Sequence, residues 1–243
     1  MRGLPPPAPT VPAMKKALLL LPLFAASILF AFLGLEAPTA AANEPVGEIE
    51  RLRAGNERYA SGEFLRLHQS FERRSEVAKG QKPFATIVGC ADSRVPPELV
   101  FDQGLGDLFV VRCAGGVLGD AAIGSIEYAA EHLGCPLVVV LGHERCGAVD
   151  AVVQGGALPG HLAAFTPAIQ PVLNESRRRG GDVLDGAVRL NALRIAAGLR
   201  ASEPILHELV EQGKLTILAA RYDLDTGEVE FLEEPEGGGP RHP

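Results

Sequence analysis

Residues 84–97 read FATIVGCADSRVPP, and this stretch decides how the chain around it must fold. Its first seven residues, 84–90, have the length and apolar composition of a strand buried on both faces. A thiol, a carboxylate and a guanidinium then follow at every second position, as Cys90, Asp92 and Arg94. A polar turn could carry these residues by accident, whereas a metal site would need all three. The rest of the sequence is needed to distinguish a polar turn from a metal site.

Further short apolar runs follow and alternate with helical segments. The expected strands are 84–90, 107–112, 137–142, 215–221 and an alternating, half-exposed edge strand at 228–233. The expected helices are 44–61, 120–133, 146–154, 161–179 and 184–200. Pro167 and Pro171 are expected to break or kink the fourth of these helices. The alternation predicts an α/β fold with a mostly parallel sheet and helices on both faces.

Composition restricts the classes of function. The 243 residues are 47% hydrophobic, which is enough for one globular domain with a substantial core. The net charge of −7 argues against nucleic acid as a partner, because a basic face would be expected there. Aromatic residues make up 5% of the chain and Trp is absent, so a stacking platform for bases or sugars is not expected either.

The N-terminal segment has the parts of an export signal. Two lysines precede the uncharged run at 17–35, and small residues follow it up to Ala42. This pattern predicts a leader and secretion signal at 1–42, cleaved after Ala42. The alternative is an uncleaved anchor, because the apolar run nearly reaches the roughly 20 residues that span a bilayer. We expect a periplasmic or secreted domain at 43–234, a disordered tail at 235–243, and membrane contact only through the signal.

A second polar segment follows the strand expected at 137–142. It reads VLGHERCGAV and places His143 and Cys146 three positions apart. Cys90 and His143 both follow strands of the expected parallel sheet, and open α/β sheets bind ligands at the carboxyl ends of their strands. One imidazole and two thiolates suit Zn²⁺ and leave a fourth position open for water or substrate.

The chain has two other cysteines. Cys113 follows the strand at 107–112 at the same edge of the sheet, so strand position does not exclude it as a fourth ligand. Cys135 precedes Pro136 at the opposite end of its strand and is a poor candidate.

Two long segments resemble the β-class carbonic anhydrases. They are CADSRVPPELVFDQGLGDLFVVRCAG at 90–115 and GSIEYAAEHLGCPLVVVLGHERCGAV at 124–149, and the resemblance extends over about 49–231. It implies a four-stranded parallel sheet with an added edge strand. It also implies dimers in which an N-terminal helix arm embraces the partner, and pairing of dimers into tetramers.

The same resemblance implies a set of site residues. Zinc is expected on Cys90, His143 and Cys146, with Asp92 and Arg94 as a dyad beside the metal. Substrate contacts are expected from the side chain of Gln81, the backbone N–H near Gly147, and an apolar pocket with Phe109 and Tyr128. An ordinary core role would explain Phe109 equally well, and a core or interface role would explain Tyr128.

The expected activity is reversible hydration of CO2 to bicarbonate and a proton. A zinc-bound hydroxide would attack CO2, Asp92 would orient that hydroxide, and Arg94 would hold Asp92 ionised and away from the metal. One subtype of the family carries Trp three positions before the first zinc cysteine and closes its site at low pH. This chain has Ile87 there, so we expect the open form, with Asp92 on Arg94.

Other functions remain as alternatives. The same fold and metal could hydrolyse carbon disulfide or carbonyl sulfide, and the ligand set does not distinguish these substrates from CO2. A noncatalytic zinc or bicarbonate-binding module would have no need for the orienting carboxylate of Asp92. A thiol redox protein is disfavoured because the chain contains no C-x-x-C sequence.

Overall fold

A computed structural model describes residues 47–232 of the protein. The leader and signal predicted at 1–42 and the tail predicted at 235–243 lie outside the described residues, and both stay predictions. None of the helices between residues 47 and 232 is long and apolar enough to cross a membrane.

The described residues form one five-stranded sheet in the order β2-β1-β3-β4-β5. Its strands are β1 (Ala85–Gly89), β2 (Leu108–Arg112), β3 (Leu137–His143), β4 (Thr216–Tyr222) and β5 (Val229–Leu232). The first four strands pair in parallel, whereas β5 runs antiparallel to β4 at the edge. The expected parallel sheet with an added edge strand is therefore confirmed.

Helices and short turns connect the strands. They are α1 (Glu48–Ser61), α2 (Phe71–Val77), α3 (Pro97–Val100), η1 (Ala114–Gly116), α4 (Asp120–Glu127), η2 (Tyr128–His132), α5 (Gly147–Gln154), η3 (Gly160–Ala164), α6 (Phe165–Arg179), α7 (Val183–Arg200) and α8 (Ile205–Glu211). The segment expected as one helix at 161–179 begins with the 3-10 helix η3 and becomes α-helical at Phe165. The helix α6 then continues through Pro167 and Pro171, so the break expected at these prolines is wrong. The helix α2 was not predicted, because it buries none of its residues and so has no apolar stripe. Its N-cap is Ser70, whose side chain accepts a hydrogen bond from the Arg73 N–H.

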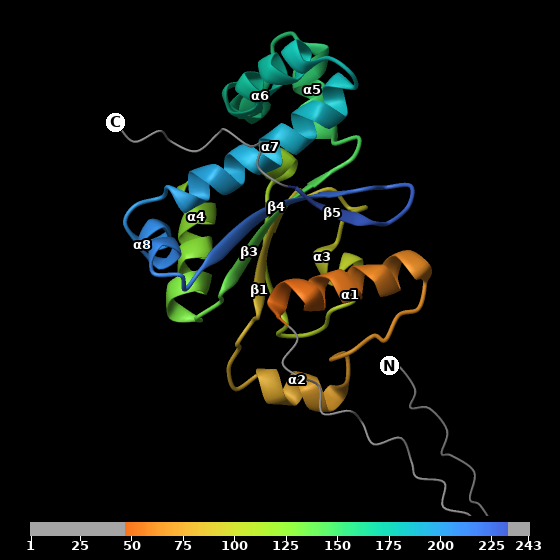
Figure 1. Ribbon diagram of the computed structural model, residues 1–243, viewed down its shortest axis with the longest axis vertical. Coiled ribbons are helices and arrows are strands. Elements are labelled where there is room, and N and C mark those ends of the chain that lie inside the picture. Colours follow the sequence, from red (N-terminus) through yellow and green to blue (C-terminus); the bar gives the residue numbers. More distant parts are fainter. Residues whose placement is uncertain (1–46, 233–243) are drawn as a thin grey trace, which may run out of the picture. The chain divides into compact units, whose positions relative to one another are not determined.

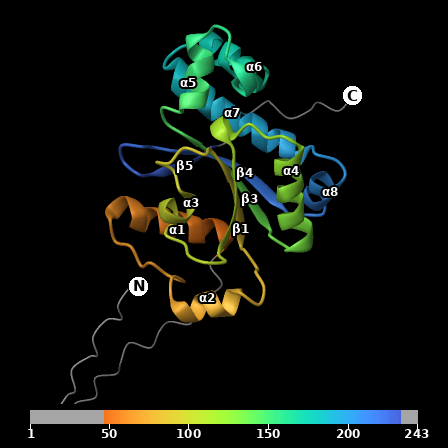
Figure 2. The same cartoon turned by 180° about the vertical axis from the view of Figure 1, so that it is seen from behind.

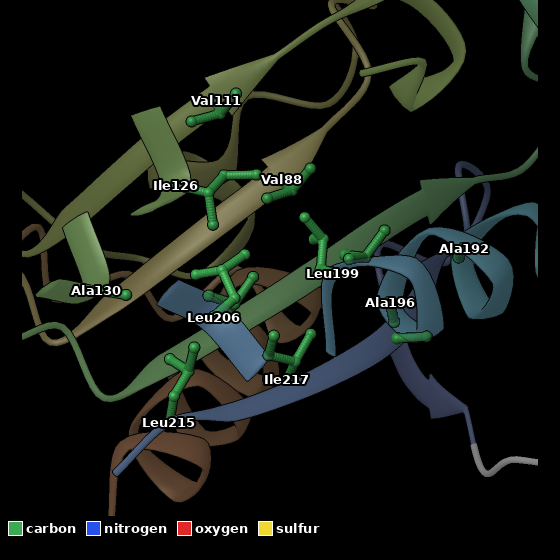
Figure 3. Packing of buried hydrophobic residues seen from close by; sticks show 13 residues of the cluster. Val88, Val111, Ile126, Ala130, Ala192, Ala196, Leu199, Leu206, Leu215 and Ile217 are labelled. Carbon is green, nitrogen blue, oxygen red and sulfur yellow. The ribbon is translucent and has the colours of Figure 1, made fainter. Parts of the chain in front are cut away.

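Alternate residues of the strands enter two separate hydrophobic clusters, one on each face of the sheet. Val88, Val140 and Ile217 pack with residues of α4, α7 and α8 on one face (Figure 3). Ile87 and Val139 pack with residues of α1 and of the segment around α3 on the other. Figures 1 and 2 show the same division, with α4, α7 and α8 on one side of the sheet and α1 and α3 on the opposite side. Helices on both faces are thus confirmed.

The N-terminal helix α1 lies against its own sheet. Its narrow apolar stripe centres on Leu52, which is fully buried in the cluster that contains Ile87 and Val139. A Cβ on Gly55 would lie 1.9 Å from the backbone oxygen of Phe101, so this close approach of α1 to the end of α3 requires glycine.

A third cluster lies beyond the carboxyl ends of the strands. It joins Val149 of α5 and Ile169 of α6 to Val188 of α7, and it includes Cys90 and Cys146 (Figure 1). Cys90 and Cys146 of the polar motifs therefore lie in an apolar, buried environment, whereas Arg94 is exposed.

Candidate metal centre

Two segments distant in sequence meet at the carboxyl edge of the sheet. Cys90 directly follows β1, His143 is the last residue of the adjacent strand β3, and Cys146 directly precedes α5. Their exposed fractions are 7%, 1% and 2%, and their ligand atoms all lie within 4.8 Å of one another. The sheet thus brings one imidazole and two thiols into a single buried cluster.

His143 has one engaged and one unpartnered ring nitrogen. Its Nδ1–H donates to the backbone oxygen of Glu144 at 2.9 Å, which leaves the lone pair on Nε2. That Nε2 atom is buried and finds no hydrogen-bond partner among the described residues. A buried polar atom without a partner is costly, so a ligand for Nε2 is expected.

The donor set fits Zn²⁺. Two thiolates about 2.3 Å from a tetrahedral zinc ion would be about 3.8 Å apart. The Cys90 and Cys146 Sγ atoms are 3.9 Å apart, and neither cysteine forms a disulfide. Metal-binding histidines commonly donate their second ring N–H to a carbonyl, as His143 does.

The cluster contains no fourth His, Cys, Asp or Glu among residues 47–232. Cys113, which strand position left open as a ligand, lies outside it although it follows β2 at the same edge. Cys135 is buried elsewhere and its sulfur accepts a hydrogen bond from Thr86 Oγ1 at 3.3 Å. A site with three protein ligands keeps a position for water or substrate.

A second group of acidic residues lies nearby but is occupied by arginines. Glu144, Asp223 and Asp225 also place oxygen atoms within 4.8 Å of one another. Arg145 pairs with both oxygens of Asp225 at 2.9 and 2.7 Å, and Arg221 pairs with Asp223 at 2.7 Å. These ion pairs explain the group without a metal.

Asp92 lies beside the cluster in a forked ion pair with Arg94. The Arg94 guanidinium donates to the two carboxylate oxygens at 2.9 and 2.7 Å, and the Arg94 backbone N–H adds a third bond at 3.0 Å. These bonds from Arg94 outweigh burial and hold the pKa of Asp92 well below its usual range. The Asp92 Oδ2 atom is 3.8 Å from His143 Nε2, so an ionised carboxylate lies next to the open side of the cluster.

The environment makes Cys90 the thiolate of the cysteine pair. A hydrogen bond from Cys146 lowers the pKa of Cys90 most strongly; burial opposes this shift, and His143 and the Gly115 N–H add to it. The pKa of Cys146 is raised, because the neighbouring Cys90 and burial both favour its neutral form. The contact between the two sulfurs therefore favours a thiolate at Cys90 over one at Cys146.

Two further residues support the first cysteine, and the sequence motifs did not identify them. Arg112, the last residue of β2, donates through Nε to the Cys90 backbone oxygen at 2.8 Å and also to that of Asp92. The Gly115 N–H donates to Cys90 Sγ at 3.2 Å. Arg112 is a cation at the carboxyl end of β2, at the same sheet edge as Cys90. This position was the signal in the sequence that could have identified it.

The substrate residues implied by the resemblance are divided in space. Gly147 is the first residue of α5, where backbone N–H groups lack helical partners, and a Cβ at this position would meet nothing within 4 Å. Gln81 is exposed and precedes β1, whereas Cys90 follows it, so a strand of five residues, roughly 13 Å, separates them.

Phe109 and Tyr128 also lie away from the cluster within this chain. Phe109 pairs with Thr86 near the start of β1 rather than with the carboxyl end of that strand. Its ring is 6.4 Å from that of Tyr128, which is 46% exposed. One chain therefore brings together the three candidate ligands with Asp92, Arg94 and Gly147. Gln81, Phe109 and Tyr128 lie elsewhere in that chain.

Comparison with known proteins gives a consistent result. A family model described as carbonic anhydrase matches residues 85–229. Carbonic anhydrase 2 of Mycobacterium tuberculosis is 43% identical over 187 residues, which cover 75% of this chain and 90% of that protein. The region matched by the family model contains Cys90, His143 and Cys146.

Solved structures share the architecture. The β-carbonic anhydrase CcaA superimposes with a TM-score of 0.61 at 26% identity, covering 76% of this chain and 95% of that one. A structure from a study of two tetrameric β-carbonic anhydrases of the filamentous ascomycete Sordaria macrospora also gives a TM-score of 0.61, covering 74% of this chain and 93% of that one. At 24% identity, the second likeness concerns the fold.

Proposed function

The chain belongs to the β-class carbonic anhydrases, and we propose that it catalyses reversible hydration of CO2 to bicarbonate and a proton at a zinc site formed by Cys90, His143 and Cys146. The observation that carries the zinc assignment is the buried, unpartnered Nε2 of His143 beside two cysteine sulfurs. Bound Zn²⁺ supplies the Lewis acidity that makes water a nucleophile near neutral pH.

Asp92 and Arg94 have separate tasks in this proposal. Asp92 accepts a hydrogen bond from the attacking water and directs a water lone pair toward the carbon of CO2. Arg94 keeps Asp92 ionised and, through the forked pair, away from the cluster. The Gly147 N–H, at the start of α5, donates to the oxygen on which negative charge develops.

We further propose that the active form is a dimer, or a tetramer formed by two dimers, with a site completed by a second copy. Gln81, Phe109 and Tyr128 lie away from the metal ligands of their own chain, and Gln81 and Tyr128 are exposed. In the proposed dimer these residues lie in the partner's site. Because a two-fold interface is reciprocal, each chain then supplies them to the other. In that site Gln81 would donate to substrate and the two rings would form an apolar wall.

The proposal is tested by stopped-flow CO2 hydration together with a zinc assay. We expect one zinc per chain in the wild type, loss of zinc in Cys90→Ser, and retained zinc with a large rate loss in Asp92→Asn. Cys113→Ser is the matched control, since Cys113 lies at the same edge but outside the cluster, and it should keep both zinc and activity. Undiminished activity in Cys90→Ser would refute the mechanism, and faster turnover of carbon disulfide or carbonyl sulfide than of CO2 would refute the substrate.

We also propose export from the cytoplasm, on the basis of the N-terminal sequence. Protein recovered from the periplasm or medium should begin at Asn43, as N-terminal sequencing would show. A full-length chain found only in the membrane fraction would indicate an anchor, and a full-length cytoplasmic chain would contradict export.

A further inference from the structure

Helix α7 carries a buried amide on its apolar face. Asn191 is 6% exposed, and its buried neighbours on the helix include Val188, Ala192 and Ala196. Burying an amide among apolar groups is costly unless it is hydrogen-bonded. The Asn191 Nδ2–H donates to the backbone oxygen of Gly115 at 2.8 Å.

Gly115 is at the centre of the turn η1. Its φ of +65° lies in the left-handed region, and a Cβ there would be 3.1 Å from the Cβ of Ala148. The N–H of this same residue donates to Cys90 Sγ at 3.2 Å. The Asn191 amide and the Cys90 sulfur are therefore linked through one residue, whose carbonyl accepts from one and whose N–H donates to the other.

Asn191 also lies beside a cavity that the three proposed metal ligands line. It shares the lining of a cavity of about 20 Å³ with Cys90, His143 and Cys146. The cavity has room for about one water. A substitution at Asn191 therefore changes a cavity that the residues of the cluster also line.

We propose that Asn191 is a positioning residue for the metal centre: it holds the turn η1 so that the Gly115 N–H stays directed at Cys90 Sγ. The inference rests on the proposed role of Cys90 as a zinc ligand. A hydrogen bond to an anionic sulfur is charge-assisted, and it fixes the direction in which the sulfur presents its lone pairs. Loss of partners behind metal ligands typically weakens metal affinity by about 10- to 100-fold.

Asn56 supplies a matched control. It is also 6% exposed, and its Nδ2 donates to the backbone oxygens of Val100 at 3.1 Å and Gly227 at 2.8 Å. It belongs to α1, on the opposite face of the sheet from α7. Asn56 thus ties α1 to the end of α3 and to the turn between β4 and β5, as Asn191 ties α7 to η1, but none of these hydrogen bonds reaches the cluster.

The experiment measures zinc affinity by competition with a chelator in Asn191→Leu and Asn56→Leu of the full chain. Leu has nearly the shape of Asn and removes the donor. We expect about 10- to 100-fold weaker zinc binding in Asn191→Leu and unchanged affinity in Asn56→Leu. In Co²⁺-loaded protein, the sulfur-to-cobalt absorption band should shift only in Asn191→Leu. Thermal melts of both variants report the loss of stability separately.

Asn191→Ser provides a second variant if Asn191→Leu does not fold, because its shorter side chain no longer reaches Gly115 but remains polar. Zinc affinity and cobalt spectrum equal to the wild type in a folded Asn191 variant would overturn the inference. So would equal losses of affinity in the Asn191 and Asn56 variants. A wild-type chain that binds no zinc would refute the proposed function instead, so the two failures are distinguishable.

Discussion

The two ring nitrogens of His143 face different surroundings, and this difference determines what the residue can do. Nδ1 is held by the Glu144 carbonyl, and Nε2 is left with its lone pair facing two sulfurs. Asp92 differs, because Arg94 engages both of its carboxylate oxygens and so opposes movement of the carboxylate toward the cluster.

Removal of Arg94 should separate orientation from metal binding. In Arg94→Gln we expect zinc to be retained and CO2 hydration to fall by about 10- to 100-fold, because Asp92 loses the cation that orients it. Stopped-flow rates and zinc content measure the two effects. Arg145→Gln is the control: Arg145 forms a similar forked pair with the exposed Asp225, and its hydration rate should stay within about threefold of wild type. Equal losses in both variants would contradict the role given to Arg94.

At the scale of elements, a buried carboxylate fixes the chain that follows α1. Asp102 is 3% exposed, and it accepts hydrogen bonds from Arg58 of α1 and from the backbone N–H groups of Leu65 and Arg66. Burial raises the pKa of Asp102, but these hydrogen bonds outweigh burial and the net pKa is lowered. The connection from α1 to α2 therefore depends on an ionised Asp102.

The sign of the resulting pH dependence follows from that lowered pKa. The stabilising contribution of Asp102 is present above the unfolded pKa of about 3.9 and is lost as pH falls through the lower folded value. Asp102→Asn should lower the free energy of unfolding by about 3 kcal/mol near pH 7 and flatten the acid limb of the stability curve. Urea unfolding from pH 7 to pH 3 measures both effects. Glu57→Gln, on the exposed face of α1, should change stability by less than about 0.5 kcal/mol, and an unaltered acid limb in Asp102→Asn would contradict the assignment.

At the scale of the whole molecule, the separation of Gln81 from Asp92 makes assembly testable through activity. Gln81→Leu and Asp92→Asn should each form nearly inactive homodimers. Coexpressed in equal amounts, they should recover about a quarter of wild-type activity, because half of the dimers are mixed and each mixed dimer has one intact site. Stopped-flow assays of the copurified mixture measure this. No recovery, despite mixed dimers shown by mass spectrometry, would place both residues in the site of a single chain.

Much of the fold follows from local sequence. The apolar runs at 84–90 and 137–142 have no polar face, so they can only be strands covered on both sides, and the helical segments between them supply that cover. The short helices α2 and α3 were not predicted. The seven residues of α2 include no buried one, and the four residues of α3 form a single turn, which is too short to show a periodic pattern. The resemblance to a known family added the site residues that no local pattern could have identified.

The sequence by itself determined which residues end two strands of one parallel sheet, and hence that Cys90 and the His143–Cys146 pair share one edge of that sheet. Only the tertiary structure decided that Cys113 stays outside the cluster and that the Gly115 N–H reaches the Cys90 sulfur. The physical reason is that the common direction of parallel strands fixes which edge a residue occupies, whereas side-chain distances depend on how turns such as η1 pack against distant helices such as α7.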